Sequence, residues 1–421
     1  MIRIAAATLL LGCAPGAEAP APVTERLKPA TACEQCHPQQ AAEWRQSMHA
    51  HAALSPVVRR MVALAEEETV SFAGKDCWSC HAPAAAIVGE LVPGAPAGFS
   101  PVSNDGVTCD MCHALAHAPE PASRDLASRL GDPGVVYGNL ANPAATPGHG
   151  AAERTFFAGS SLCSACHQFS VERELEDTFA EWQQTGLAAS ALECPTCHMP
   201  EYAGAAALGT PGRPVLHRHG FVGTDYALEP RDGVDVSAQK EGIRSLLRLA
   251  LKVAVLGMPS SVAAGSAFDF GVALTNNRSG HSIPSGVPFL REMWILVEVT
   301  DAAGATVYRS GGLGPKGDLA PDPALASFGA RLLDFSGDPT WFTWRAATLD
   351  KSPCLAFGET RTSPYTVAVP AGTAGPLGVR VTVRYRPLPP GLLRALGLEA
   401  LPPIEVFDLW SDEWTVDIQG G

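Results

Sequence analysis

The pentapeptide CEQCH at residues 33–37 is the first of five segments in which two cysteines, three positions apart, are followed at once by a histidine. The others are CWSCH at 77–81, CDMCH at 109–113, CSACH at 163–167 and CPTCH at 194–198. With 12 Cys and 12 His in 421 residues, random placement gives about 0.01 such segments. The five segments are therefore not an accident of composition, and they determine how the first half of the chain folds.

This spacing matches the covalent attachment of haem. Two thiols three positions apart can form thioether bonds with the two vinyl groups of one haem, and the next histidine then binds the iron as its proximal ligand. The motifs therefore predict five covalently bound haems c. The predicted thioether cysteines are Cys33, Cys36, Cys77, Cys80, Cys109, Cys112, Cys163, Cys166, Cys194 and Cys197, and the predicted proximal ligands are His37, His81, His113, His167 and His198.

Zinc sites and disulfides are the alternatives for paired cysteines. Zinc sites usually combine two Cys-x-x-Cys pairs and require no adjacent histidine. Disulfides form in exported proteins and require no histidine either. Five motifs that each end in histidine therefore favour haem. Of the two remaining cysteines, Cys354 is expected to be a buried free thiol, and Cys13 lies in the N-terminal segment.

Seven further histidines are available for a second axial position, which an electron-transfer haem usually fills with His or Met. The distal candidates are His49, His149, His219, His281, His51 and His217. His49 is the best of them, and His219 is preferred over His217. His117 follows His113 by four residues and is equally well explained as a solvated side chain.

An internal repeat concerns the same ligands. AEWRQS at residues 42–47 recurs as AEWQQT at 180–185, each after a haem motif. Five residues after the tryptophan, the first copy has His49 whereas the second has Leu187. We therefore expect the haem of the second copy to take its distal ligand from elsewhere or to keep an open side.

The C-terminal half has no haem motif and changes to period-two alternation, which predicts strands. The apolar positions are Leu247, Leu249, Leu251, Val253 and Val255; Phe268, Phe270, Val272 and Leu274; Met293, Ile295, Val297 and Val299; and Val379, Val381, Val383 and Tyr385. Short strands separated by turn residues predict an antiparallel, Ig-like β-sandwich. The predicted fold class is α+β, with a mostly helical and irregular multihaem domain before this sandwich.

The N-terminus has the features of an export signal. Arg3 precedes a short apolar run, and Leu10 to Cys13 resemble a bacterial lipobox, which makes Cys13 a lipidation candidate. The predicted organisation is a signal peptide or lipobox (1–13), a flexible tether (14–30), a pentahaem domain (31–225), a linker (226–244) and a β-sandwich (245–421).

The formal net charge of −13 argues against a nucleic-acid partner, because phosphate binding requires clustered Lys and Arg. The expected partners are redox proteins, with membrane tethering through the N-terminus and an oligomer both left open. The expected location is the periplasm or the bacterial cell surface.

The segment NNRSGHSIPSG at residues 276–286 presents His281 in a Gly- and Pro-rich loop at the end of a predicted strand. One interpretation is a surface turn with a solvated histidine. The other is that the β-domain supplies His281 to a haem of the first domain.

The chain resembles the multihaem c-type cytochromes related to cytochrome c-554 and, more distantly, hydroxylamine oxidoreductase. The similar stretches are CEQCHPQQAAEWRQSMHA, GVTCDMCH, and LCSACHQ through TFAEWQQT to CPTCHMP. The loop at 276–286 is similar to one found in β-domains appended to such cytochromes, with Ser285 in place of the usual Thr. The resemblance implies closely spaced haems and supports His49, His149, His219 and His281 as axial ligands.

The leading functional hypothesis is an electron-transfer protein with six-coordinate haems. The alternative is an oxidoreductase that reduces or oxidises a small nitrogen or sulfur compound at one open-sided haem, so enzymatic activity stays undecided. A third possibility is a subunit of a polymerised haem wire.

Overall fold

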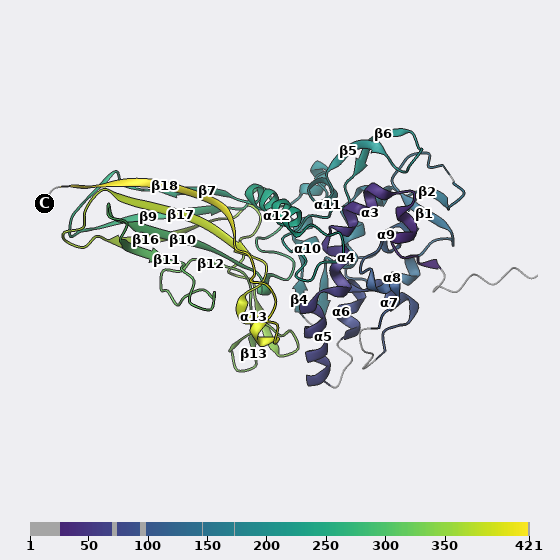
Figure 1. The fold of residues 1–421 in the computed structure, drawn as a ribbon, viewed down its shortest axis with the longest axis horizontal. Helices are drawn as coiled ribbons and strands as arrows, with labels where there is room; N and C mark the ends of the chain where they lie inside the picture. The colour runs from purple at the N-terminus through teal and green to yellow at the C-terminus, as the bar shows by residue number, and fades with distance from the viewer. Residues whose placement is uncertain (1–25, 70–73, 93–97, 145, 172, 420–421) are drawn as a thin grey trace, which may run out of the picture.

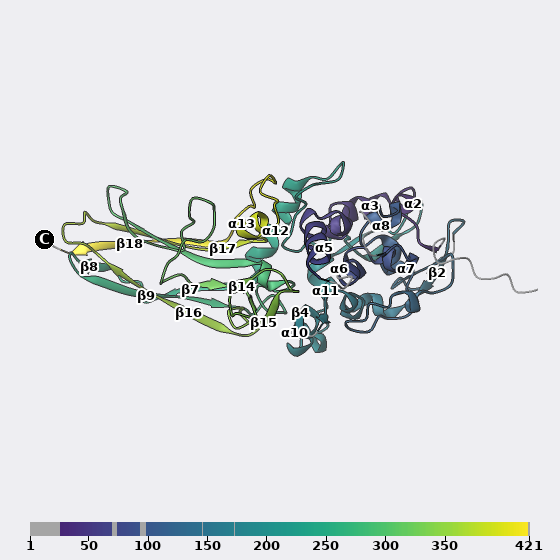
Figure 2. The same ribbon diagram turned by 90° about the horizontal axis from the view of Figure 1, so that it is seen from below.

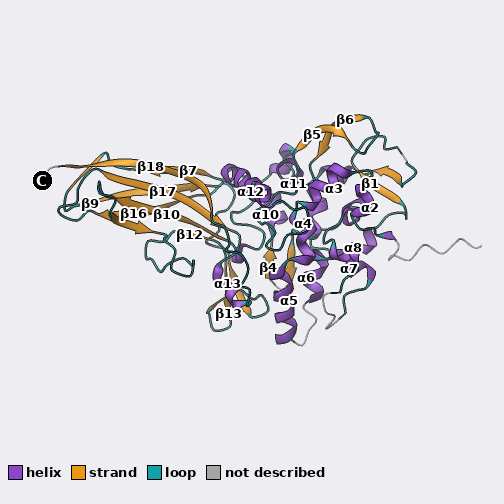
Figure 3. Cartoon of the chain, viewed as in Figure 1, coloured by secondary structure: helices purple, strands orange, loops and turns teal. Residues whose placement is uncertain are grey.

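The computed structural model describes residues 26–69, 74–92, 98–144, 146–171 and 173–419. It has two lobes arranged end to end, one of helices and loops and one of long strands (Figures 1 and 3). The predicted α+β architecture is confirmed. The predicted signal segment, Cys13 and most of the tether lie outside the described residues.

Short helices and 3-10 turns dominate the first lobe, called the haem lobe below. Proline at the first helical turn starts several of them, because its fixed φ suits that position and its missing N–H is not needed there. The helices are α2 (Thr31–Glu34), α3 (Pro38–Arg45), α4 (Met48–His51), α5 (Pro56–Glu68), α6 (Gly74–His81), α7 (Pro83–Val88), α8 (Pro101–Asn104), α9 (Cys109–His113), α10 (Thr178–Gln184) and α11 (Cys194–His198). The 3-10 turns are η1 (Ala52–Leu54), η2 (Ala127–Arg129), η3 (Thr155–Ala158), η4 (Ser160–Ala165) and η5 (Leu187–Ser190).

Three two-stranded sheets complete the haem lobe. Strands β1 (Val135–Gly138) and β2 (Gly150–Glu153) are parallel. The antiparallel pairs are β3 (Phe169–Val171) with β4 (Arg173–Glu176), and β5 (Glu201–Ala205) with β6 (Gly212–His217). The lobe is thus mostly helical and irregular, as predicted.

Helix α12 (Val236–Ala250) joins the lobes, and it corrects one prediction. Asp235 caps it by accepting hydrogen bonds from the main chain of Ser237 and Ala238. Ile243 and Leu247 are buried one turn apart, whereas Leu249 is 63% exposed. The strand predicted from Leu247 is therefore wrong, because these leucines follow the helical period and strand β7 begins only at Lys252.

The second lobe is a β-sandwich whose two layers are visible in Figure 2. One sheet has the order β11-β10-β17-β18-β8, with β12 beside β10, and the other has β16-β9-β7. The strands are β7 (Lys252–Leu256), β8 (Ser261–Ala263), β9 (Ala267–Thr275), β10 (Glu292–Thr300), β11 (Thr306–Ser310), β12 (Ser327–Phe328), β16 (Thr360–Ala368), β17 (Leu377–Arg386) and β18 (Phe407–Gln419). The pairing is antiparallel except that β8 and β18 run parallel. The apolar positions predicted for β9, β10 and β17 are all buried, and in β10 the intervening Trp294 and Leu296 are buried as well.

A smaller sheet and two short helical elements lie where the sandwich meets the haem lobe. They are β13 (Arg331–Asp334), β14 (Pro339–Thr340), β15 (Ala346–Asp350), η6 (Pro288–Leu290) and α13 (Pro390–Ala395). Val57 of α5 packs in one apolar cluster with Phe289, Leu332 and Leu392 of this region. The haem lobe and the sandwich therefore share a buried apolar contact.

Candidate haem sites

Each motif forms a helical turn that brings its two thiols together. Helices α9 and α11 consist of the five motif residues alone, and α6 ends with its motif. In the first and fourth motifs, the histidine N–H donates to the carbonyl of the first cysteine at 2.9 Å. Every cysteine of the motifs is a free thiol, so all ten are available for thioether bonds. Cys354 is also free and is buried, as predicted.

Three proximal histidines are oriented by a main-chain carbonyl. Their Nδ1 atoms donate at 2.7 Å from His37 to Ala206, from His113 to Tyr137 and from His198 to Val222. A histidine ligand usually donates its other ring N–H in this way, which fixes the tautomer and leaves Nε2 free for the metal. These rings are therefore prepared to bind iron through Nε2.

Three pairs of histidine rings face one another across the haem lobe. Their centroids are 6.3 Å apart for His37 and His149, 6.3 Å for His49 and His167, and 6.2 Å for His113 and His219. Two imidazoles on one metal have centroids about 6 Å apart, because a metal–nitrogen bond measures about 2 Å. The spacing leaves room for one iron between the rings of each pair. The residues present therefore fit haem.

Two of the distal rings are also in the neutral form that a metal requires. Burial, together with nearby His167, lowers the pKa of His49 to about 3. Burial and nearby His113 lower the pKa of His219 to about 4. Both imidazoles are therefore neutral at pH 7, with a lone pair available.

His281 comes from the β-sandwich lobe and lies close to His198. Burial lowers the pKa of His198, and His281 adds to this effect. The loop that carries His281 is held from within, because buried Asn276 donates to the carbonyls of His281 (2.8 Å) and Leu355 (2.9 Å). The His281 Nδ1 donates to Ser282 at 2.8 Å. The main chain at His281 is thus held in one arrangement, and its half-buried side chain lies on the side of the loop near His198.

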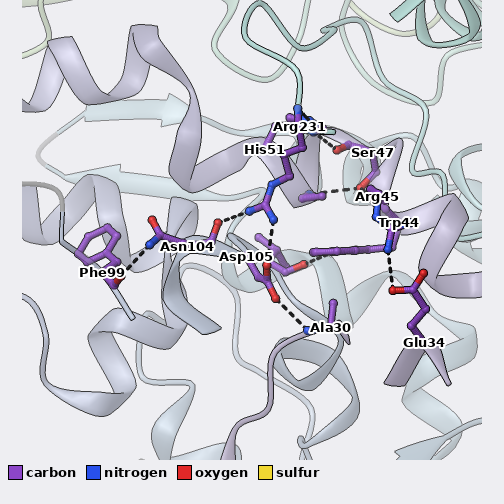
Figure 4. Close-up of polar contacts among 12 residues, drawn as sticks. Ala30, Glu34, Trp44, Arg45, Ser47, His51, Phe99, Asn104, Asp105 and Arg231 are labelled. Carbon is purple, nitrogen blue, oxygen red and sulfur yellow. Dashed lines mark hydrogen bonds and ion pairs between the residues drawn. The ribbon is translucent and has the colours of Figure 1, made fainter. Parts of the chain in front are cut away.

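The other two candidates have different surroundings. Buried His51 donates from Nδ1 to the carbonyl of Ser47 (2.9 Å), and its Nε2 accepts the main-chain N–H of Arg231 at 3.4 Å. Arg231 in turn pairs with Asp105, as Figure 4 shows. His217 donates to Met199 and faces no other histidine ring among the described residues. The geometry therefore joins His49, His149 and His219 to proximal rings, places His281 near His198, and leaves His51 and His217 apart.

His81, like His198, is in none of the three facing ring pairs. No histidine ring faces it within the described part of the chain, which includes all 12 histidines. Burial lowers its pKa, while a hydrogen bond with the backbone of Ala52 and the charge of nearby Asp225 act the other way. Asp225 accepts two 2.6 Å bonds from Arg291 of the β-sandwich lobe. The surroundings of His81 thus contain a half-buried ion pair.

Cysteines of different motifs lie in contact. Cys33 and Cys109 lie close enough that each thiol shifts the pKa of the other, and the same holds for Cys80 with Cys166 and for Cys163 with Cys194. Cys112 lies near both Cys163 and Cys166. Because a thioether sulfur marks the edge of its haem, these contacts place the five attachment points in one connected group.

Sequence reasoning missed Phe221. Its ring lies 4.5 Å from His49 and 5.9 Å from His219, between the distal rings of two pairs. Its φ of +44° is uncommon for a residue with a side chain. The adjacent carbonyl of Val222 accepts the bond from His198. The only sequence signal was its place two residues after His219.

Comparisons with known proteins agree with this geometry. The family described as "Cytochrome c554 and c-prime" matches residues 32–114, which contain the first three motifs. The crystal structure of a penta-haem cytochrome c552 from Thermochromatium tepidum is similar over 94% of this chain and 100% of its own, with a TM-score of 0.66 and 20% identity. Residues 32–114 are thus similar to this cytochrome family, and the chain shares the fold of a penta-haem cytochrome over most of its length.

The other similar structures give no information on the function of this chain. AvmM, which catalyses macrocyclization in alchivemycin A biosynthesis, and the sporulation control protein Spo0M from Bacillus subtilis each align with 41% of this chain and with 90% and 50% of their own. Both are 11% identical, and their TM-scores of 0.20 and 0.16 carry no argument. No curated protein matches. No described helix of the cytochrome has the length and apolar character to cross a membrane.

Proposed function

We propose that this multihaem cytochrome binds five haems c and transfers electrons between redox partner proteins. The observation that carries the proposal is the set of three facing ring pairs, His37 with His149, His49 with His167, and His113 with His219. Two strong axial ligands leave no position for a substrate on an iron. His281 beside His198 supports a fourth such pair.

When bound, the haems supply iron that alternates between the ferric and ferrous states. The chain fixes their attachment, ligation and burial. In the proposed path, the first motif contacts the third, the third lies near the fourth, and the fourth contacts both the second and the fifth. The fourth motif, Cys163 to His167, is therefore the branch point.

The surroundings of the protein are part of the proposal. Covalent haem attachment and the N-terminal pattern support export to the periplasm or cell surface, with Cys13 as a lipid anchor. The net charge of −13 is compatible with a partner that presents a basic surface. Assembly into a haem wire stays a prediction that solution scattering would test.

A specific observation favours a second candidate function. His81 has no facing histidine ring among the described residues, while the half-buried pair of Arg291 and Asp225 lies nearby. A haem held by His81 with an open distal side would bind a small nitrogen or sulfur compound, and these charged groups would orient it or move protons.

Low-temperature electron paramagnetic resonance of the oxidised protein separates the two functions. Low-spin signals from all five irons would support electron transfer alone. A high-spin signal from one iron, lost when cyanide or nitrite is added, would support the second function at that haem. A matched His281→Met variant should alter one low-spin signal, and an unchanged spectrum would rule out ligation by His281.

A further inference from the structure

The two copies of the Ala-Glu-Trp repeat occupy equivalent places in the fold. The first lies on α3 and the second on α10. Three residues before each tryptophan, a buried residue donates its N–H to the carbonyl of the preceding proximal histidine. These bonds join Ala41 to His37 (3.0 Å) and Phe179 to His167 (2.9 Å). Trp182 follows its histidine at a longer interval than Trp44, and the β3–β4 hairpin fills the difference.

Each tryptophan also binds the main chain just before a later haem motif, the third motif for Trp44 and the fifth for Trp182. Trp44 Nε1 donates to the carbonyl of Val107 at 2.8 Å, and Trp182 Nε1 donates to that of Leu192 at 3.0 Å. Both carbonyls lie two residues before the first cysteine of a motif. The first cysteines then meet, Cys33 with Cys109 and Cys163 with Cys194. Each repeat helix therefore joins one motif to another as a two-haem unit.

The glutamate of each copy binds the main chain at a distal histidine. Glu43 accepts the N–H of His219 itself at 2.8 Å and a bond from Arg218 at 2.6 Å. Glu181 accepts the N–H of Ser282, next to His281, at 3.0 Å and the hydroxyl of Ser285 at 2.8 Å. In both units, one repeat helix thus contacts the segment that brings a histidine to the unit's second motif.

The Glu181 contact is supported by packing at Gly280. This glycine has a φ of +75°, and a Cβ there would lie 3.0 Å from the Leu187 side chain. Thr178, one turn earlier on α10, accepts the N–H of Gly286 at 3.0 Å and bonds Ser285 at 2.7 Å. The loop at residues 276–286 of the β-sandwich lobe therefore packs against α10 and the η5 turn that follows it.

We infer that Glu43 and Glu181 are positioning residues for the distal ligands His219 and His281 of the third and fifth haems. This inference rests on the proposed electron-transfer function. A carboxylate that accepts a main-chain N–H makes a strong, directional bond, which fixes where the adjacent imidazole can lie. Its negative charge also favours the more positive ferric iron. The two glutamates therefore set both the geometry and the reduction potential of their haems.

The test uses the full-length, haem-loaded protein with Glu181→Gln, Glu43→Gln and the control Glu413→Gln, which removes an exposed carboxylate of β18. Each glutamine keeps a hydrogen-bond acceptor and loses the charge. We expect one haem in each of the first two variants to become easier to reduce. At a fixed applied potential, its ferric-to-ferrous ratio should fall by about tenfold, which corresponds to a rise of about 59 mV in its one-electron reduction potential. The two variants should affect different haems, and the control should affect none.

Two further variants identify the haems. The signal changed by Glu181→Gln should be the one altered by His281→Met, and that changed by Glu43→Gln should be the one altered by His219→Met. If His281→Met alters a signal while Glu181→Gln and Glu181→Ala leave it unchanged, the positioning role is refuted and ligation stands. If His281→Met alters no signal, ligation fails, and with it this part of the proposed function.

Discussion

The two lobes fill their interiors in different ways. In the β-sandwich, the chain supplies its own core, and Met293, Ile295 and Val297 are fully buried. In the haem lobe, apolar contacts form four small separate clusters, and several of the fully buried residues are alanines such as Ala50, Ala53 and Ala82. Small side chains leave space for large cofactors. The comparison teaches that the sandwich has a continuous apolar core of its own, whereas the haem lobe is built in the way expected of a lobe that takes part of its core from cofactors.

The largest effect should come from removing the branch point of the haem lobe. Cys163→Ala with Cys166→Ala removes both thioether bonds of the fourth haem, so the mass should fall by one haem and the Soret absorbance by about one fifth. Reduction of the other haems should no longer equilibrate on the millisecond scale. Cys354→Ala is the control and should keep the full mass. An unchanged haem content in the double variant would contradict the attachment.

A substitution in the core of the sandwich should lower the free energy of unfolding of that lobe more than that of the haem lobe. Ile295→Ala leaves a cavity in the sandwich and should lower the free energy of unfolding of that lobe by about 2–5 kcal/mol. Denaturation followed by circular dichroism should show this loss, while the Soret band of the haems that the sandwich does not ligate changes only at higher denaturant. The exposed Leu249→Ala should stay within about 0.5 kcal/mol. A Soret band that melts with the sandwich in the variant would show that the lobes unfold as one unit.

Replacing His51 should destabilise the haem lobe without affecting any iron. The His51→Ala variant leaves the carbonyl of Ser47 and the N–H of Arg231 without partners, at a cost of about 1–3 kcal/mol. The low-spin signals should all remain. His149→Ala is the matched comparison and should convert one iron to high spin. Loss of a low-spin signal in His51→Ala would make His51 a ligand.

The smallest effect concerns an exposed ion pair between the lobes, formed by Glu68 and Arg345. Hydrogen bonds from Arg345 and Trp344 of the second lobe lower the pKa of Glu68 on α5 to about 2. Glu68→Gln should lower Tm by no more than about 2 °C at pH 7, because the pair is exposed. The pKa of Glu68 is lower in the folded protein than in the unfolded chain. The ion pair therefore stabilises the fold fully above the ordinary Glu pKa of about 4.3, and this stabilisation disappears as the pH falls towards 2. Glu67→Gln, which removes a pair within α5, should show no change in the contact between lobes.

The same contrast explains what the sequence could predict. Alternation in β9, β10 and β17 predicted a sandwich because strand faces depend on local pattern alone. The motifs predicted the haem attachment because their chemistry is local too. The pairing of rings was not predictable, since His49 follows the first motif but faces His167 of the fourth. Helix α12 was mistaken for a strand because Leu247, Leu249 and Leu251 satisfy a two-residue period while Ile243 and Leu247 satisfy a helical one.

The position of His281 in the chain has a consequence for how the protein is made. All ten attachment cysteines precede residue 200, so every porphyrin can be joined to a polypeptide that still lacks its second half. The imidazole that lies beside His198 is supplied only when the later strands have folded and carried their loop back onto α10. Completion of the last iron centre would then report that the strands on either side of this loop have folded.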